Sequence, residues 1–308
     1  MSIQLTGIHK AFGPKQILRG LDLDVEEGET VSLVGFSGAG KSVTLKHIAG
    51  LLMPDRGSVV VDGKEVPKLS RNDLYRMRLD MGYVFQFAAL FDSMTIGDNV
   101  AMGLRQKGGM SEKEIQARIA ESLGRVGLEG FEKRLPSELS GGQRKRAGLA
   151  RAIAYRPKYL LYDEPTSGLD PVTTEVIDRL IIRMKEDLGV TSLVITHDMK
   201  SAYAISDRIA MLFEGQVVEV GTPEQIQRGL RTFPGLAHRM EEVARHGRVL
   251  FVNDSKATNV DATVKALQSF PGNIHIILGG KDKGSDYTAL ITWPNRGGGE
   301  RAAGGSAR

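Results

Sequence analysis

Residues 35–42 read Gly-Phe-Ser-Gly-Ala-Gly-Lys-Ser, a G-x-x-x-x-G-K-[ST] pattern that needs a strand before it and a helix after it. The apolar residues 31–34 predict the strand, and residues 41–52 predict the helix, which Pro54 ends. These flanks disfavour the alternative, a glycine-rich turn with an incidental lysine. Glycines let several backbone N–H groups converge on phosphate oxygens, and the helix N-terminus adds its positive dipole. We therefore predict that phosphate is bound by Gly35, Phe36, Ser37, Gly38, Ala39 and Gly40, with Lys41 at the terminal phosphates and Ser42 on Mg²⁺.

The rest of the chain alternates strand and helix patterns. Residues 1–30 alternate apolar and polar side chains, which predicts short antiparallel strands, and residues 58–62 predict another strand. Residues 87–150 have a largely helical pattern, in which Ser111 and Glu114 form a capping box and Gly127 ends one helix. The later predicted strands are 159–163, 192–196, 209–213 and 217–220, and the later predicted helices are 173–188 and 199–206. This order predicts an α/β fold with a largely parallel sheet.

Two carboxylates, Asp163 and Glu164, follow the predicted strand 159–163. A nucleotide hydrolase needs such a pair beside its phosphate site, one carboxylate to hold Mg²⁺ and one to orient or deprotonate the attacking water. We assign the first role to Asp163 and the second to Glu164. By itself, an acidic strand end is more often the start of a solvated loop. Together with a phosphate-binding loop, it predicts the second half of the site.

The composition limits the classes of protein to which the chain can belong. Without cysteine there are no disulfides and no thiolate metal sites. Residues 1–5 lack the features of a signal peptide, and no run of about 20 apolar residues predicts a membrane-spanning helix. The net charge is +4, but the densest basic cluster, Arg144-Lys145-Arg146, is expected to be solvated charge on a helix. An anionic membrane surface or an acidic partner explains the charge equally well, and we expect no nucleic acid.

Between the two halves of the site lies Leu139-Ser140-Gly141-Gly142-Gln143, and with this pentapeptide the chain resembles the ATP-binding cassette (ABC) family. The resemblance covers residues 1–227 and implies a P-loop NTPase fold of ABC type, with an antiparallel β subdomain and a helical signature subdomain. The pentapeptide matches the signature motif of the family. Four further elements occur in the expected order: Phe12 as the aromatic that stacks on adenine, Gln86 as the Q-loop glutamine, residues 167–170 as the D-loop and His197 as the switch histidine.

The resemblance implies an ATPase that uses Mg²⁺, with Lys41, Glu164 and His197 as its catalytic residues. Two copies would clamp two ATP molecules, so that the signature motif of one protomer meets the γ-phosphate on the other. Gln86 would join Ser42 and Asp163 at the metal, and the nucleotide-binding residues would include Phe12, Gln86, Ser140, Gly141, Gly142, Gln143 and Asp170. Each of these residues has an ordinary alternative. Phe12 could be a core aromatic, Gln86 a surface amide, His197 a satisfied strand-end histidine, and residues 140–143 a plain helix cap.

The resemblance also implies partners. With no span of its own, the chain would dock on a separate permease at the cytoplasmic face of the inner membrane, through the apolar residues 87–95. Residues 40–48 and 85–95 resemble ATPases of Mla-type phospholipid transporters, which work with an MCE-type lipid-binding subunit. Several of those ATPases carry methionine where this chain has Gln143. A small-solute importer therefore remains an alternative, and a non-transport ABC protein is a more distant one.

Beyond residue 227 the ABC pattern stops. Residues 228–291 resemble part of the C-terminal domain of UDP-N-acetylmuramoyl-L-alanine–D-glutamate ligase, in the stretches 232–241, 253–259 and 278–283. They predict one strand–helix–strand unit, with strands 249–253 and 274–278 around a helix 260–269, and the resemblance places Ser255, Lys256 and Thr258 near phosphate or substrate. Such a fragment could not catalyse ligation alone. Residues 292–308, rich in glycine, alanine and arginine, predict a disordered tail, and the whole chain is interpreted as a fusion.

Overall fold

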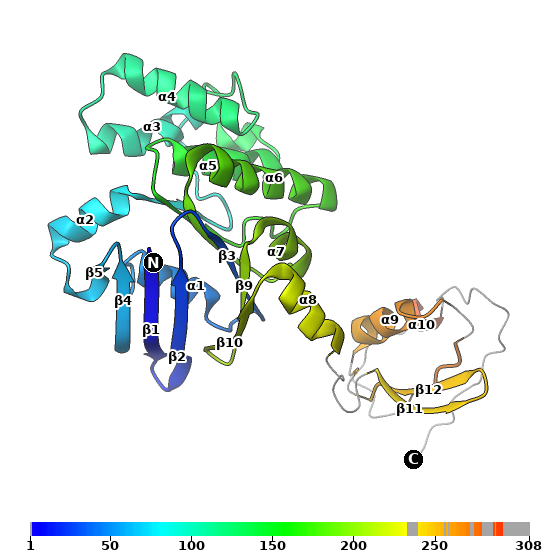
Figure 1. The fold of residues 1–308 in the computed structure, drawn as a ribbon. Coiled ribbons are helices and arrows are strands. Elements are labelled where there is room, and N and C mark those ends of the chain that lie inside the picture. The colour runs from blue at the N-terminus through cyan, green and yellow to red at the C-terminus, as the bar shows by residue number, and fades with distance from the viewer. Residues whose placement is uncertain are drawn as a thin grey trace. The chain divides into compact units, whose positions relative to one another are not determined.

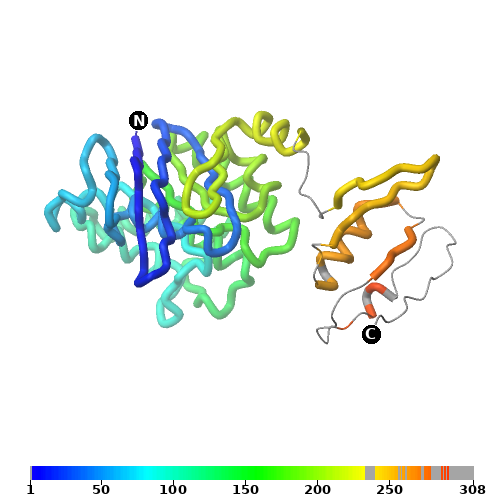
Figure 2. Tube along the Cα trace, turned by 90° about the horizontal axis from the view of Figure 1, so that it is seen from below, coloured from blue at the N-terminus to red at the C-terminus, as the bar shows by residue number. Residues whose placement is uncertain are grey.

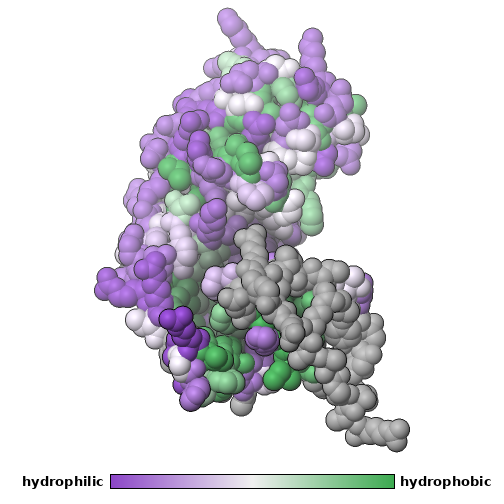
Figure 3. Space-filling model, turned by 90° about the vertical axis from the view of Figure 1, so that its right-hand side faces the viewer, coloured by the Kyte–Doolittle hydropathy of each residue, from purple (hydrophilic) through white to green (hydrophobic). Residues whose placement is uncertain are grey.

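A computed structural model describes residues 2–232, 240–255, 257, 259–271, 274–278, 286 and 288–291. The chain divides into two compact units, residues 1–230 and 231–308, and each is described by itself. In the described part of the chain, every helix is too short or too polar to cross a membrane. On the face drawn in Figure 3, hydrophilic side chains dominate and apolar side chains form separate patches.

The first unit is built around a six-stranded sheet with the strand order β10-β9-β3-β8-β7-β6. The strands are β3 (Thr30–Gly35), β6 (Met81–Val84), β7 (Tyr159–Asp163), β8 (Thr191–Thr196), β9 (Arg208–Phe213) and β10 (Gln216–Gly221). All neighbouring pairs run parallel except β9 and β10. The central strands β3 and β8 are buried on both faces, as the apolar runs in their sequences indicate. The expected α/β fold of P-loop type is confirmed.

A second sheet is antiparallel and has the order β2-β1-β4-β5. Its strands are β1 (Ile3–Phe12), β2 (Lys15–Val25), β4 (Arg56–Val61) and β5 (Lys64–Glu65). Alternate side chains of β1 and β2 pair across the strands, with Ile3 opposite Val25 and Leu5 opposite Leu23, and all four are buried. This period-two burial packs the sheet onto the core and leaves its polar side chains outside.

Helices cover the sheets and form a separate helical region. They are α1 (Lys41–Ile48), α2 (Arg71–Leu79), α3 (Ile96–Lys107), α4 (Glu112–Arg125), α5 (Gly141–Ile153), α6 (Pro171–Leu188), α7 (Met199–Ile205) and α8 (Pro223–Thr232), with 3₁₀ turns η1 (Val66–Lys68) and η2 (Pro136–Glu138). Figure 1 shows α3, α4, α5 and α6 gathered at one end of the unit, whereas α1 packs against β4 and β8. One apolar core is shared by α3 to α6, and another lies between α1 and the two sheets.

Helix α4 matches its sequence pattern closely. Ser111 Oγ accepts a hydrogen bond from Glu114 N at 3.3 Å, and Glu114 Oε2 accepts one from Ser111 N at 2.7 Å. Ile115, Ile119 and Leu123 are buried on one face of the helix. The capping box and the apolar stripe thus position α4 against α3 and α5.

Other expectations were wrong in detail. The helix expected over 41–52 ends at Ile48, because Gly50 adopts the left-handed conformation with a φ of 62°. The guanidinium of Arg78 donates hydrogen bonds to Ala49 O and Gly50 O and so satisfies the last carbonyls. The helical stretch 87–150 is three helices with loops between them, and sequence reasoning missed α2 and β6 altogether.

The second unit differs from the expected strand–helix–strand arrangement. Strand β11 (Glu241–His246) pairs antiparallel with β12 (Val249–Asn253), and α9 (Val260–Gln268) and the short α10 (Thr288–Ile291) follow (Figure 2). Gly247, with a φ of 59°, allows the tight turn between β11 and β12. Residues 274–278 form no strand, so that expectation was wrong. Lys256, Thr258, residues 279–283 and the tail 292–308 lie outside the described residues.

A buried carboxyl group joins α6 to α7. Asp178 Oδ2 accepts a hydrogen bond from Ser201 Oγ at 2.9 Å, while Asp178 Oδ1 is buried and has no hydrogen-bond partner among the described residues. Burial raises the pKa of Asp178 to about 6, and the nearby Asp198 adds to that effect. The ionised form of Asp178 is therefore less favourable in the folded chain than in the unfolded chain.

Replacing Asp178 by Asn should stabilise the protein at neutral pH. The folded pKa lies above the ordinary value, so between about pH 4 and pH 6 the folded chain binds more protons than the unfolded chain. The stability advantage of Asp178→Asn over the wild type should then be about 1 to 3 kcal/mol above pH 6 and should vanish toward pH 4. Urea unfolding, followed by circular dichroism near pH 4 and above pH 6, measures this difference in the free energy of unfolding. The exposed Asp92→Asn serves as the control, and an equal pH dependence in both variants would contradict the prediction.

Candidate nucleotide-binding site

The loop between β3 and α1 contains glycines that pack closely against neighbouring atoms. Any larger residue in their place would force those atoms to move. A Cβ on Gly35 would lie 2.5 Å from Leu212 O of β9. Gly40, the N-cap of α1, has a φ of 109°, and a Cβ there would lie 2.7 Å from Leu18 Cδ2. The loop therefore follows the path that the sequence pattern predicts, directly before the N-terminus of a helix.

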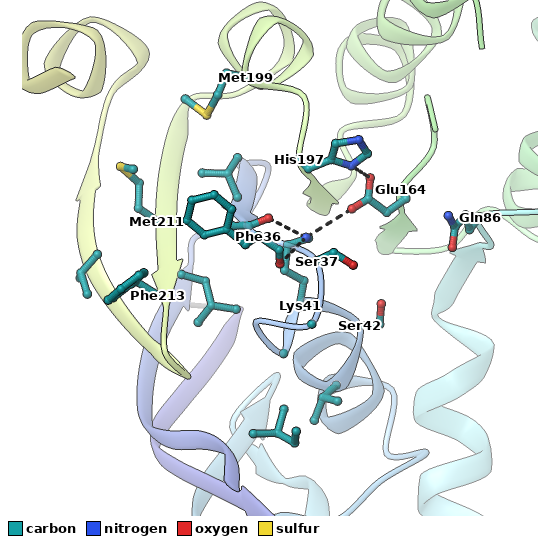
Figure 4. Close-up of a pocket in the computed structure, with 18 of the residues that line it drawn as sticks. Phe36, Ser37, Lys41, Ser42, Gln86, Glu164, His197, Met199, Met211 and Phe213 are labelled. Atoms are coloured by element: carbon teal, nitrogen blue, oxygen red, sulfur yellow. Dashed lines mark hydrogen bonds and ion pairs between the residues drawn. The ribbon is translucent and has the colours of Figure 1, made fainter. Parts of the chain in front are cut away.

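Lys41 closes over this loop from the first turn of α1. Its ammonium donates hydrogen bonds to Gly35 O at 2.7 Å and to Phe36 O at 3.2 Å, and it lies 3.4 Å from Glu164 Oε1 (Figure 4). The side chain is buried, so its charge is matched by these three oxygens instead of by water. A cation held in this way over a glycine loop can bind an anionic ligand such as a phosphate group.

Asp163 and Glu164 leave the end of β7 in different directions. Asp163 Oδ1 accepts a hydrogen bond from Ser42 Oγ at 3.0 Å, and Asp163 Oδ2 accepts one from Tyr83 Oη at 3.2 Å. Burial and the Asp163 carboxylate raise the pKa of Tyr83, so its phenol stays protonated and donates. Glu164 has a φ of 50°, a strained conformation for this residue type, and its Oε2 lies 2.7 Å from His197 Nδ1. Its carboxylate therefore bridges Lys41 and His197 (Figure 4).

The oxygens near Ser42 suit a magnesium ion. A hydroxyl and a carboxylate meet at 3.0 Å, and both are hard ligands of the kind that Mg²⁺ prefers. Among the described residues there is no group of three or more acidic, histidine or cysteine side chains that could hold a metal ion. Phosphate oxygens would have to complete the ligands, as is usual for Mg²⁺ at nucleotides. Gln86 stands nearby and donates from Nε2 to Ser167 Oγ at 3.4 Å.

A pocket of about 1000 Å³ opens beside the glycine loop, and neither Ala39 nor Asp163 is among the residues that line it. Of the residues expected to bind nucleotide or metal, the pocket is lined by Phe12, Gly35, Phe36, Ser37, Gly38, Gly40, Lys41, Ser42, Gln86, Glu164 and His197. Phe12 is half exposed there, which excludes the core-aromatic alternative. The pocket is also lined by apolar side chains of β9 and α7, among them Met199, Met211 and Phe213 (Figure 4).

The signature pentapeptide does not line this pocket. Ser140 is the N-cap of α5, where Ser140 Oγ accepts from Gln143 N at 3.3 Å and Gln143 Oε1 accepts from Ser140 N at 2.8 Å. A Cβ on Gly142 would lie 2.5 Å from Thr173 Cγ2, so glycine lets α5 pack against α6. The helix-cap alternative is thus correct as a local description, and any contact of Ser140 with nucleotide would need another molecule.

Asp170 also acts as a helix cap. Its Oδ1 accepts hydrogen bonds from the backbone N–H groups of Val172 and Thr173, both at 3.0 Å, at the start of α6. The hydrogen bonds from Thr173 and Val172 lower the pKa of Asp170, so it remains ionised. The residues from 167 to 170 thus form a short turn that ends on a fixed helix N-terminus.

The basic cluster Arg144-Lys145-Arg146 differs in part from the expectation of solvated charge. Arg144 donates to Leu139 O, Arg146 donates to Val126 O and Gly127 O, and Lys145 donates to Ser167 O. Arg144 is exposed, so the expectation of solvated charge stands for it, whereas Lys145 and Arg146 are partly buried against main-chain carbonyls of other segments. Helical spacing could have shown part of this, because Lys145 lies three residues before Gly148 and seven before Ala152, both on the buried face of α5.

Comparison with known proteins identifies the fold and the family. The family model for ABC transporters matches residues 18–167. The probable ribonucleotide transport ATP-binding protein mkl of Mycobacterium tuberculosis is 43% identical over 224 residues, 73% of this chain and 62% of that protein. The chloroplastic protein trigalactosyldiacylglycerol 3 of Arabidopsis thaliana is 41% identical over 236 residues, 71% of this chain and 68% of that protein. The chain belongs to the ABC transporter family.

A solved structure agrees with this assignment. The ATP-binding cassette MJ0796, seen as a dimer in a post-hydrolysis state bound to ADP and Pi, superposes with a TM-score of 0.67 at 36% identity. The match covers 72% of this chain and 98% of that one. The cassettes to which this chain is similar are ATPases. The chain spans only about 62% of the length of the mkl protein.

Substituting alanine for Gly40 should distort the loop and leave the other side chains of the site unchanged. The φ of 109° and the contact with Leu18 together should lower the free energy of unfolding by about 1 to 3 kcal/mol. The distorted loop should weaken binding of a fluorescent ATP analogue about tenfold or more. Gly124→Ala is the control, because the nearest atom to its new Cβ is Glu129 Oε1 at 3.7 Å. Wild-type affinity in Gly40→Ala would show that the loop does not bind phosphate.

Proposed function

We propose that the chain binds ATP with Mg²⁺ in this pocket and hydrolyses it. The observation that carries the proposal is the Glu164 carboxylate, held 3.4 Å from the Lys41 ammonium and 2.7 Å from His197 Nδ1 at the mouth of the glycine loop. Lys41 would bind the terminal phosphates, Glu164 would orient or deprotonate water, and His197 would contact the γ-phosphate. Ser42, Asp163 and Gln86 would hold Mg²⁺, which neutralises charge on the phosphates. Phe12 would stack on the base.

The site would be completed by a second copy of the chain. Ser140, Gly141, Gly142 and Gln143 lie at the N-terminus of α5, outside the pocket of their own chain. A helix N-terminus attracts anions, so these residues suit a γ-phosphate presented by a partner, with Asp170 shaping the adjoining turn. The dimeric form of the similar cassette MJ0796 supports this arrangement.

Replacing Glu164 by Gln tests the catalytic role directly. The amide keeps the shape of the side chain but can neither accept a proton nor pair with the Lys41 charge, so turnover should fall at least about 100-fold. Binding of MgATP should persist. Equilibrium titration measures the binding, and a phosphate-release assay on the same preparation measures the turnover. Glu175→Gln, on the exposed face of α6, is the matched control and should keep wild-type turnover. Unchanged turnover in Glu164→Gln refutes the role.

Hydrolysis would drive transport through a separate permease at the cytoplasmic face of the inner membrane. A docking surface for it is formed by Phe85, Phe87, Phe91 and Met94, all exposed, in and after the loop that holds Gln86. The loop is held from two sides. Asn99 of α3 accepts from Phe91 N at 2.7 Å and donates to three carbonyls, and Arg151 of α5 donates to Ala88 O and Ala89 O. An ordered apolar surface of this kind is typical of a site for a partner protein.

Phe87→Asp should abolish capture of the permease from detergent-solubilised native membranes. Phe87 is 85% exposed, so a charge there is tolerated by the fold but would be buried unpaired against an apolar partner. Leu51→Asp, at another exposed apolar position, is the control. Mass spectrometry of the captured membrane protein also identifies the class of cargo. Equal capture by both variants and the wild type would place the docking surface elsewhere.

For the cargo we propose phospholipid. The resemblance of residues 40–48 and 85–95 to Mla-type ATPases supports it, as does similarity to a plant protein named after a galactolipid. An MCE-type lipid-binding subunit would then be a further partner. The alternative is a small-solute importer. It is favoured by the similarity to the mycobacterial mkl protein, whose name gives ribonucleotide as its probable cargo.

The ligase resemblance of the second unit has no support beyond its sequence. The two relatives and the solved structure reported above cover 71–73% of the chain and lend no support to the ligase resemblance of residues 228–291. Ser255 follows β12, whereas Lys256 and Thr258 lie outside the described residues. We assign no activity to this unit.

A further inference from the structure

Lys145 connects two parts of the site that the sequence places far apart. It lies one turn into α5, the helix that begins at the cap residue Ser140. Its ammonium donates to Ser167 O at 2.6 Å and lies 3.4 Å from Glu164 O. The side chain thus crosses from the signature helix to the turn that follows β7, and both of these contacts are with main-chain carbonyls.

The turn that receives Lys145 is the one that sets the direction of the Glu164 side chain. Glu164 has the left-handed φ of 50°, which a glutamate adopts only where its surroundings hold it. Within the turn, Ser167 N donates to Glu164 O and Leu169 N donates to Thr166 O, both at 3.2 Å. These are long bonds over a few residues. The Lys145 ammonium adds charge-assisted hydrogen bonding to the first and last carbonyls of the same turn.

Ser167 is the point where three segments meet. Its carbonyl accepts from Lys145 of α5, its hydroxyl accepts from Gln86 after β6, and its N–H donates to Glu164 O. Lys145 is half-buried in this contact, and burial lowers its pKa to about 8. The two carbonyl contacts therefore offset only part of the cost of taking the ammonium out of water, and at pH 7 Lys145 still carries its charge in most molecules.

We propose that Lys145 is a positioning residue for ATP hydrolysis, which fixes the turn from Glu164 to Ser167 onto α5 so that the two move as one body. The inference rests on the function proposed above. In the dimer, Ser140 at the start of α5 would meet the nucleotide of the partner, while Glu164 would act on the nucleotide of its own chain. Docking of α5 on one nucleotide would then set the carboxylate at the other.

The contact is tested first without nucleotide, by hydrogen–deuterium exchange of the full-length chain. In Lys145→Met, the amides of Ser167 and Leu169 should exchange about tenfold faster than in the wild type, because the turn loses its outside donor. Lys145→Arg, which keeps a charged donor, should restore most of the protection. Lys113→Met removes an exposed lysine of α4 and should leave these amides unchanged. If Lys145→Met does not fold, Lys145→Gln takes its place under the same criteria.

Steady-state kinetics then separate positioning from binding. In Lys145→Met, kcat should fall about tenfold, whereas KM for ATP should change less than twofold, because Lys145 does not line the pocket. Lys145→Arg should recover kcat to within about threefold of the wild type. Wild-type exchange of the turn in Lys145→Met, or a kcat within twofold of the wild type, would overturn the proposal. If the wild type and Glu164→Gln hydrolyse ATP equally, the proposed function fails, whereas the exchange experiment still decides whether Lys145 holds the turn.

Discussion

Parallel pairing of β8 with β3 on one side and with β7 on the other is the constraint on which the rest of the structure depends. Val34 stands opposite Thr196, and Asp163 stands opposite Ile195. Parallel strands end at the same edge of a sheet, so the glycine loop, the two carboxylates and His197 meet there. Because these strands are buried on both faces, their register is held by the core on either side of the sheet.

At that edge, opposite charges hold one another in place. Lys41 is bound by two carbonyls and by Glu164, and Glu164 in turn is bound by His197. A triphosphate arriving at the loop would compete with Glu164 for the Lys41 ammonium. In the proposed function, binding of nucleotide would therefore be linked to release of the Glu164 carboxylate from the Lys41 ammonium. The backbone of Glu164 is strained, so the position of its carboxylate also depends on the turn that surrounds it.

Much of the fold could be predicted where a short stretch carries its own signal. The capping box of α4 and the buried apolar run of β7 lie at the residues expected for them. The end of α1 was misplaced although Gly50 is a local signal for it, and only the structure shows that Arg78, far along the chain, takes the carbonyls of Ala49 and Gly50. The hairpin of β11 and β12 was missed since its first strand is polar in pattern and mostly exposed.

The sequence by itself determined which groups could do chemistry: glycines that permit a phosphate loop, a lysine and a serine at a helix start, and two carboxylates after an apolar strand. Such features depend on neighbours along the chain. Only the tertiary structure decided which groups meet, since Tyr83 reaches Asp163 across 80 residues and Lys145 reaches Ser167 across 22. It also placed Lys145 and Arg146 on carbonyls of distant segments, where the sequence predicted solvated charge. Long side chains can reach many partners, and the packing of the helices selects among them.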